Sequence, residues 1–299
     1  MSTSIHNRLL APETLAGLAN LELVARTAVE GFLTGLHRSP RFGFSQEFRE
    51  YRAYVEGDDP RFVDWNVYAR TDRTYIKRYE GETNTRLMIL LDASASMGYS
   101  SHGISKLQYA KFLAAALAYL AGRQHDPVGL IVFDEQMRQY RPATSRAGSL
   151  QSIIHAIDAV TPGGGTDLGK CFEGFREHLT RRGLVAVISD LYCDPAAMTR
   201  AVQPLAARGH DIMILQVLDP QEIEPQWHES VVLEDLETQR TINVAPEYLE
   251  QGYRQRLATH LDSLRAIAAA AGAHHALLPT DHPLDDALRR YLTFRQHRN

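Results

Sequence analysis

A short apolar run at residues 87–91 ends in the polar sequence Asp92-Ala93-Ser94-Ala95-Ser96, and this stretch constrains the fold more than any other. The run is too short and too sharply bounded for a helix, so it predicts a buried, parallel strand. The aspartate and two serines then leave the carboxyl end of that strand, where open α/β sheets place their ligand sites. Their oxygens suit a hard divalent cation such as Mg2+, although the same residue types are common in turns and helix N-caps.

Two later segments place similar side chains at the same predicted edge. Residues 162–167, Pro-Gly-Gly-Gly-Thr-Asp, form a glycine loop that offers the hydroxyl of Thr166. Residues 184–189 form a second buried-strand run, and Asp190 follows directly after it. The chain therefore contains three motifs in order: an aspartate with two serines, a threonine after glycines, and an aspartate at a strand end. We expect these side chains to converge, because the carboxyl ends of parallel strands meet at one edge.

The rest of the chain alternates between helical and strand patterns, as a doubly wound sheet requires. A helix at residues 106–122 is apolar nearly all round, which predicts deep burial. The other elements are helices at 20–36, 148–160, 168–179 and 196–207, strands at 128–133 and 212–218, a hairpin partner near 138–141, an acidic proline-bounded loop at 219–225, a small antiparallel pair at 231–236 and 240–244, a long helix, an edge strand at 275–278 and a final helix. We expect an α/β fold with a doubly wound, mostly parallel sheet flanked by helices.

Composition excludes several classes of function. A net charge of −4 argues against a nucleic-acid or anionic membrane partner. No apolar run approaches a membrane span, and the polar N-terminus does not resemble a signal peptide, so we expect a cytoplasmic protein without membrane insertion. The two cysteines, Cys171 and Cys193, favour reduced thiols over a disulfide framework.

The set Asp92, Ser94, Ser96, Thr166 and Asp190 resembles the metal-ion-dependent adhesion site of von Willebrand factor A domains. The resemblance implies that the three hydroxyls bind a divalent cation and that the aspartates bind it directly or through water. Mg2+ is the expected metal, with Mn2+ and Ca2+ as alternatives. Neutral hydroxyls satisfy a cation poorly, so the metal would keep an open position for a partner's Glu or Asp. In the competing interpretation, the serines only cap the next helix and Asp190 lies in a turn.

A second resemblance lies upstream of the first strand. Its motifs are Arg38-Ser39, Phe42-Gly43, residues 47–51, residues 54–61, Val63-Asp64-Trp65, Ala69-Arg70, residues 75–77 and Glu80. Together they resemble the signature of the bacterial domain-of-unknown-function family fifty-eight, whose members carry a von Willebrand factor A-like domain. Such proteins are commonly associated with MoxR-type AAA+ ATPases. The resemblance therefore implies an adaptor or substrate recruiter for such an ATPase, with the ATPase and its client proteins as partners.

The charged signature segment is expected to serve as a structural clamp more than as a direct partner contact. Acids and bases interleave from residue 38 to 79, which favours internal ion pairs over a nucleic-acid patch. Arg61 and Arg70 are candidates for pairing with nearby aspartates, and Trp65 and Tyr68 are expected to pack the segment onto the main domain. We predict two parts, residues 1–84 as an N-terminal helix and signature segment packed on the main domain, and residues 85–299 as the main domain itself.

Catalytic motifs are mostly missing from the sequence. Ser94 stands where the phosphotransfer loop DxDx[ST] would carry its second carboxylate, and the glycines at 163–165 lack the lysine of a phosphate-binding loop. The histidines show no HExxH spacing, and no GxSxG motif is evident. We therefore expect a non-enzymatic, metal-dependent protein-binding module. The alternatives are a metal-dependent hydrolase of phosphorylated or acidic substrates, and a structural scaffold whose site is empty.

Overall fold

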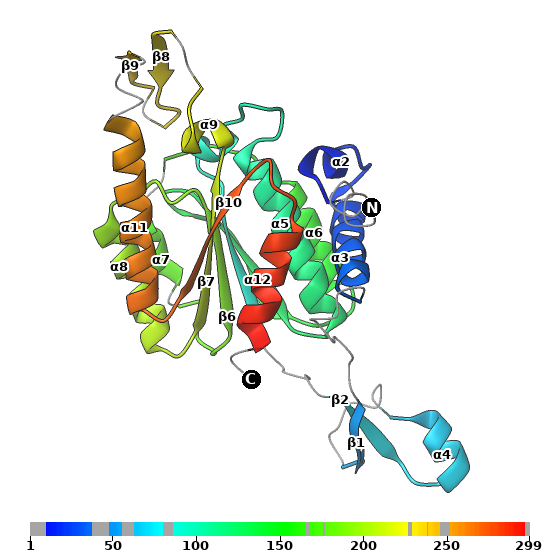
Figure 1. Cartoon of the computed structure of the whole chain (residues 1–299). Helices are drawn as coiled ribbons and strands as arrows, with labels where there is room; N and C mark the ends of the chain where they lie inside the picture. The colour runs from blue at the N-terminus through cyan, green and yellow to red at the C-terminus, as the bar shows by residue number, and fades with distance from the viewer. Residues whose placement is uncertain are drawn as a thin grey trace.

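A six-stranded sheet forms the centre of the protein (Figure 1). The structure is a computed structural model that describes residues 10–37, 48–55, 63–79, 86–165, 168–175, 177–226, 229–237, 239–245 and 252–296. The strands of the sheet are β3 (Leu87–Asp92), β4 (Val128–Phe133), β5 (Met137–Thr144), β6 (Leu184–Ser189), β7 (Asp211–Leu218) and β10 (His274–Pro279). Their order is β10-β7-β6-β3-β4-β5, and all run parallel except the edge strand β5. The predicted doubly wound, mostly parallel sheet is confirmed.

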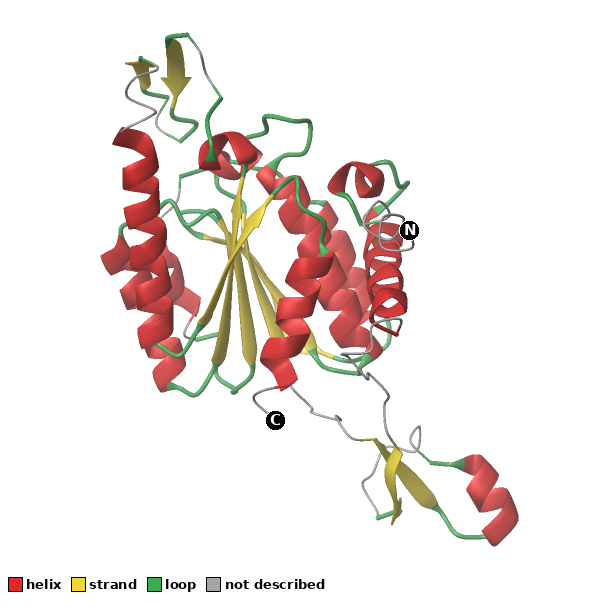
Figure 2. Cartoon of the chain, in the orientation of Figure 1, coloured by secondary structure: helices red, strands yellow, loops and turns green. Residues whose placement is uncertain are grey.

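Successive residues of β3 face opposite sides of the sheet, and each side has its own core. Leu87, Ile89 and Leu91 pack with one layer of helices, whereas Met88 and Leu90 pack with the other. Figure 2 shows helices on both faces of the sheet. The first layer contains α3 (Leu21–His37), α5 (Lys106–Arg123), α6 (Ser149–Asp158) and α12 (Asp285–Gln296), and the second contains α7 (Leu168–Phe175), α8 (Pro195–Ala207) and α11 (Arg254–Ala270). Burial on both faces explains why the parallel strands are apolar without alternation.

Helix α5 is the most enclosed helix of the first layer. Thirteen of its 18 residues are buried, and it packs on α3, α6, α12 and β3. Its many alanines let these neighbours approach closely. Ser105 begins the helix, because its Oγ accepts a hydrogen bond of 3.1 Å from the backbone N–H of Gln108. The predicted deep burial is confirmed, and it includes one charged residue, Lys106.

The segment predicted as an acidic loop after β7 contains a one-turn helix, α9 (Pro220–Ile223). Asp219 accepts a hydrogen bond from the N–H of Gln221, and Glu222 Oε2 accepts one from the N–H of Asp219. This reciprocal arrangement is a capping box, and Pro220 at the first helical position suits it. The loop prediction is therefore wrong for these residues. The predicted antiparallel pair beyond it is present as β8 (Val231–Glu234) and β9 (Thr241–Val244).

Two N-terminal parts precede the main sheet. Helix α3 lies beside α5, and the short helix α2 (Pro12–Ala16) packs against α3 (Figure 1). The strands β1 (Phe48–Ala53) and β2 (Tyr75–Tyr79) form a separate antiparallel pair, with α4 (Trp65–Thr71) between them. Much of the signature segment lies outside the described residues, including Arg61 and two of its three expected partners, Asp58 and Asp59. The third, Asp64, is buried and accepts a hydrogen bond of 3.2 Å from the N–H of Val67 in α4.

Trp65 and Tyr68 do not pack onto the main domain. They are 62% and 40% exposed, and their rings contact each other edge to face at 6.0 Å. The expectation for these two side chains is wrong, because they lie on α4, whose outer surface is exposed.

In the part of the chain that the structure describes, no helix has the length and apolar character to cross a bilayer.

Candidate metal centre

Two neighbouring parallel strands bring the predicted aspartates to one edge of the sheet. Strand β3 ends at Asp92 and β6 ends at Ser189, and the two strands pair in register along their length. Asp190 therefore leaves the sheet beside the residues that follow Asp92. The side chains of Asp92, Ser94 and Asp190 are buried, and Ser96 is half-buried. Burial of two carboxylates at one place is costly unless hydrogen bonds or positive charges compensate for it.

Hydrogen bonds hold Asp92 at both of its oxygens. Oδ1 accepts from the N–H of Ser94 at 2.8 Å, and Oδ2 accepts from Ser189 Oγ at 2.5 Å. Ser189 was not among the predicted site residues, because it reads as the last residue of an apolar strand. Its position next to Asp92 follows from the register of the two strands. Burial, together with the nearby charge of Asp190, raises the pKa of Asp92 to about 7.

Hydroxyl groups connect the first strand loop to Asp190. Ser94 Oγ lies 3.1 Å from Ser96 Oγ, and Ser96 Oγ donates a hydrogen bond of 2.7 Å to Asp190 Oδ2. Ser94 precedes a short 3-10 helix, η2 (Ala95–Gly98), but its side chain makes no capping hydrogen bond there. Ser96 bonds to a residue 94 positions away, not to its own helix. The competing interpretation, in which these serines only cap a helix, does not fit this geometry.

The glycine loop lies against the same residues. The N–H of Ala95 donates to the carbonyl of Gly164 at 2.9 Å, and the N–H of Gly163 donates to the carbonyl of Ala93 at 2.9 Å. Gly164 has a φ of +76°, and a Cβ atom there would lie 2.7 Å from Asp134 Oδ2, so only glycine fits. Thr166, the predicted fifth ligand, lies outside the described residues. The structure thus brings together Asp92, Ser94, Ser96 and Asp190, with the loop that leads to Thr166 beside them.

A buried lysine contacts the cluster from α5. Lys106 Nζ lies 2.8 Å from Asp190 Oδ2 and 2.7 Å from Glu222 Oε1, and its side chain is 0% exposed. Burial alone would lower the pKa of Lys106, but the charges of Asp190 and Glu222 outweigh burial and raise it above its usual value. The lysine is therefore charged. Neither Lys106 nor Glu222 was predicted as a site residue.

Further hydrogen bonds fix Asp190 from the side of β7 and β10. Gln216 Nε2 donates to the carbonyl of Asp190 at 2.9 Å, and His275 Nε2 lies 2.9 Å from Gln216 Oε1. Because the amide oxygen of Gln216 can only accept, His275 Nε2 is the donor in this pair. Burial of His275 lowers its pKa to about 4, so the ring is neutral. A neutral chain of hydrogen bonds thus supports the aspartate from behind.

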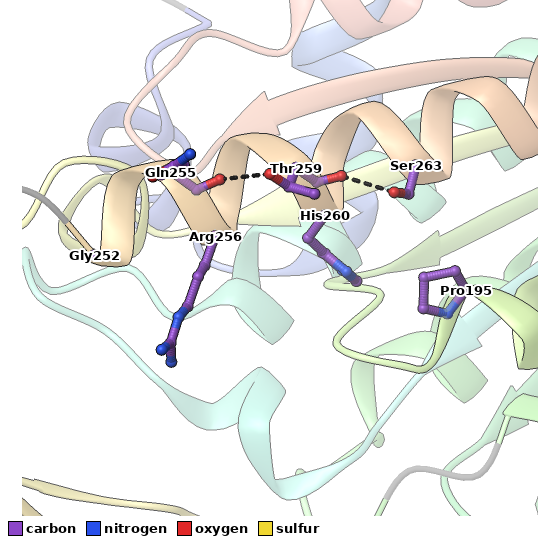
Figure 3. Close-up of a pocket in the computed structure, with 7 residues that line it drawn as sticks. All are labelled: Pro195, Gly252, Gln255, Arg256, Thr259, His260 and Ser263. Carbon is purple, nitrogen blue, oxygen red and sulfur yellow. Dashed lines mark hydrogen bonds between the residues drawn. The ribbon is translucent and has the colours of Figure 1, made fainter.

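A shallow pocket of about 550 Å3 lies along α11 (Figure 3). His260 lines it and is held next to the cluster, because its Nε2 lies 3.0 Å from the carbonyl of Leu191. The hydroxyls of Thr259 and Ser263 donate to backbone carbonyls of their own helix, as the dashed lines in Figure 3 show. None of the residues that line the pocket belongs to the predicted metal set.

The chemistry of the cluster fits a hard divalent cation. Among the residues that the structure describes, no three His, Cys, Asp or Glu side chains gather in a way that could hold a metal by themselves. The predicted set contains only two carboxylates and needs hydroxyl oxygens to complete it. These are all hard oxygen ligands, which Mg2+ and Ca2+ prefer. Asp92 and Asp190 are both 0% exposed and lie near each other, so a positive charge beside them would be favourable.

The doubly wound sheet, with this cluster at the carboxyl ends of its central strands, is of the von Willebrand factor A-like, Rossmann-type class. The chain belongs to the DUF58 family, described as a protein of unknown function, whose sequence profile matches residues 50–266. The predicted family is therefore confirmed.

Similar proteins include one curated relative and two solved structures. The uncharacterized protein Rv1480 of Mycobacterium tuberculosis (strain ATCC 25618 / H37Rv) is 28% identical over 275 residues, which cover 90% of this chain and 86% of that protein. An aerotolerance-related membrane protein from Bacteroides fragilis NCTC 9343 matches with a TM-score of 0.50 and 19% identity, over 70% of this chain and 98% of that one. The SpRpn10 VWA domain matches with a TM-score of 0.40 and 14% identity, over 68% and 93%. At such identities, the Bacteroides fragilis structure shows a shared fold alone.

Proposed function

We propose that this protein is a metal-dependent protein-binding module. A divalent cation, with Mg2+ as the first candidate, would be held by Asp92, Ser94, Ser96, Thr166 and Asp190. The observation that carries the proposal is the contact from Ser94 through Ser96 to Asp190, which joins two strand ends 94 residues apart in sequence. This contact gathers oxygen ligands and negative charge at the edge where α/β sheets bind ligands.

The bound metal would supply an electrophilic position for a carboxylate of the partner. Three of its protein ligands would be neutral hydroxyls, which leave its charge to two aspartates, one of them already paired with Lys106. The chain's own residues would orient the site, with Asp92 fixed by Ser94 and Ser189, and Asp190 fixed by Gln216. We propose a MoxR-type AAA+ ATPase as the partner, with this protein as its adaptor or substrate recruiter. The cytoplasmic location expected from the sequence stays a prediction.

A hydrolase is less well supported by the same residues. Burial raises the pKa of Cys193 to about 12, so this thiol stays protonated and is a poor nucleophile. Lys106 is held as a cation between two carboxylates and cannot act as a base at neutral pH. Binding without turnover is therefore the function that we favour.

The test is a binding titration against a MoxR-type ATPase of the same organism, in Mg2+ and in EDTA. We expect binding only with Mg2+, and a loss of roughly ten- to a hundredfold when one partner Asp or Glu becomes Asn or Gln. Ser96→Ala should weaken binding by a similar factor. The matched control is Ser100→Ala, an exposed serine four residues along the same loop, which should bind as the wild type does. Equal affinity in Mg2+ and EDTA would refute the coordination mechanism.

A further inference from the structure

A charged lysine lies buried beside the candidate metal centre. Asp190 Oδ2 accepts hydrogen bonds from both Lys106 Nζ, at 2.8 Å, and Ser96 Oγ, at 2.7 Å. The oxygen of Asp190 that contacts the predicted metal ligand Ser96 is therefore also the oxygen that the lysine contacts. A metal and an ammonium group would compete for this oxygen, because both are positive and both need it.

Lys106 keeps its charge because its surroundings are built for a cation. A buried ammonium group is unfavourable unless carboxylates and further contacts compensate for the lost water. Lys106 has two carboxylates, Asp190 and Glu222, within 2.8 Å. The ring of Tyr192 also lies beneath it, with Nζ 5.0 Å from the ring centroid.

Glu222 is itself held in place by α9. Its Oε2 accepts from the N–H of Asp219 at 2.9 Å, which leaves Oε1 for Lys106 at 2.7 Å. Its carbonyl accepts a hydrogen bond from the hydroxyl of Tyr253, at the start of α11. Glu222 therefore offers the lysine a fixed second carboxylate in addition to Asp190.

We infer that Lys106 is a built-in cation that shares the Asp190 carboxylate with the metal and so sets the affinity of the centre for that metal. Lys106 is a positioning residue for Asp190, and Glu222 is a positioning residue for Lys106. A metal held by Asp190 would repel the ammonium group of Lys106, which Glu222 would then hold. The inference rests on the proposed metal centre and is independent of the proposed ATPase partner.

The experiment measures the affinity of the full chain for Mg2+ and Mn2+ by calorimetry. In Lys106→Met, the positive charge beside the metal is lost, so we expect binding roughly ten- to a hundredfold tighter than in the wild type. In Glu222→Gln, Lys106 keeps one carboxylate partner and holds Asp190 more strongly, so we expect binding about tenfold weaker. The matched control is Lys111→Met on the same helix, where Nζ donates to the carbonyl of Asp158 at a more exposed position, and its affinity should not change.

Unchanged or weaker affinity in a folded Lys106→Met protein would overturn the inference, as would a failure of both wild type and variant to bind metal. If the wild type binds no metal and Lys106→Met does, the inference stands and the metal-dependent function fails. If the wild type binds metal and Lys106→Met binds equally well, the function survives without the inference. Should thermal melting show that Lys106→Met does not fold, Glu222→Gln decides, and unchanged affinity in that variant refutes the role of Lys106.

Discussion

Asp92→Asn should stabilise the metal-free protein at alkaline pH while it removes metal binding. Asp92 is 0% exposed and lies near the charge of Asp190, and its pKa rises from 3.8 to about 7. A carboxyl whose pKa is raised by folding stabilises the protein while it is protonated, below pH 4. That contribution is lost as the pH rises through about 7. Asparagine is neutral at every pH and has nearly the same shape.

The size of the effect follows from the pKa. The rise in the pKa of Asp92 from 3.8 to about 7 corresponds to about 4 kcal/mol, because one pKa unit is worth roughly 1.4 kcal/mol. Relaxation and water penetration around a buried charge reduce this figure, so we expect a gain of about 1–3 kcal/mol in the free energy of unfolding at pH 8. Asparagine can keep one acceptor for the N–H of Ser94, and its amide N–H can donate to Ser189 Oγ.

The assay is urea unfolding of wild type and variant at pH 5, 6.5 and 8, each in EDTA and in Mg2+. The difference between the two proteins at each pH isolates Asp92 from other titrating groups. We expect this difference to grow with pH in EDTA, and Mg2+ to stabilise only the wild type. Asp158→Asn, at an exposed aspartate that ends α6, is the control and should show neither effect. A variant less stable than the wild type at pH 8 in EDTA would refute the reasoning.

Two further predictions concern the glycine loop and the support behind Asp190. Thr166→Val keeps the shape of the side chain but deletes its hydroxyl, so binding to the ATPase should weaken, whereas the melting temperature should change little. A large loss of stability with binding intact would instead indicate a structural role for Thr166. His275 has a pKa lowered from 6.5 to about 4, so its stabilising contribution should be lost as the pH falls from 6.5 through about 4. Because the ring is partly exposed, we expect the free energy of unfolding to fall by about 1–2 kcal/mol between pH 7 and 4.5, as measured by urea unfolding. His275→Gln should reduce this loss.

The main sheet and the two aspartates could be predicted because each depends on local patterns. Strands buried on both faces read as continuous apolar runs, as at residues 87–91 and 184–189. Parallel strands end at one edge, so Asp92 and Asp190 had to lie near each other. The sequence also marks α9, because Asp219 and Glu222 have capping-box spacing around Pro220. The prolines and acidic residues of this segment are also typical of loops, and the loop prediction rested on them.

Lys106 could not be assigned to the site by the same reasoning. A lysine at the start of a helix usually lies in solvent, and nothing in the neighbouring sequence indicates otherwise. Its partners Asp190 and Glu222 follow 84 and 116 residues later, on different elements. Only the packing of α5 under the carboxyl edge of the sheet brings the three together. For Trp65 and Tyr68 the sequence predicts burial, but both side chains are exposed. Large aromatic side chains are buried only where another surface covers them.

The enclosure of α5 has a consequence for how the protein moves. Backbone amides in a largely buried helix exchange with deuterium mainly when the whole domain opens, whereas a single half-buried turn can exchange through local opening. Lys106 belongs to the enclosed helix, and Glu222 belongs to the single turn of α9. The part of the candidate site on α5 is therefore rigid, whereas the part on α9 can open locally. Any signal from the centre to the surface should pass through α9 towards Tyr253 and α11, and it should be visible first as faster exchange at residues 219–224.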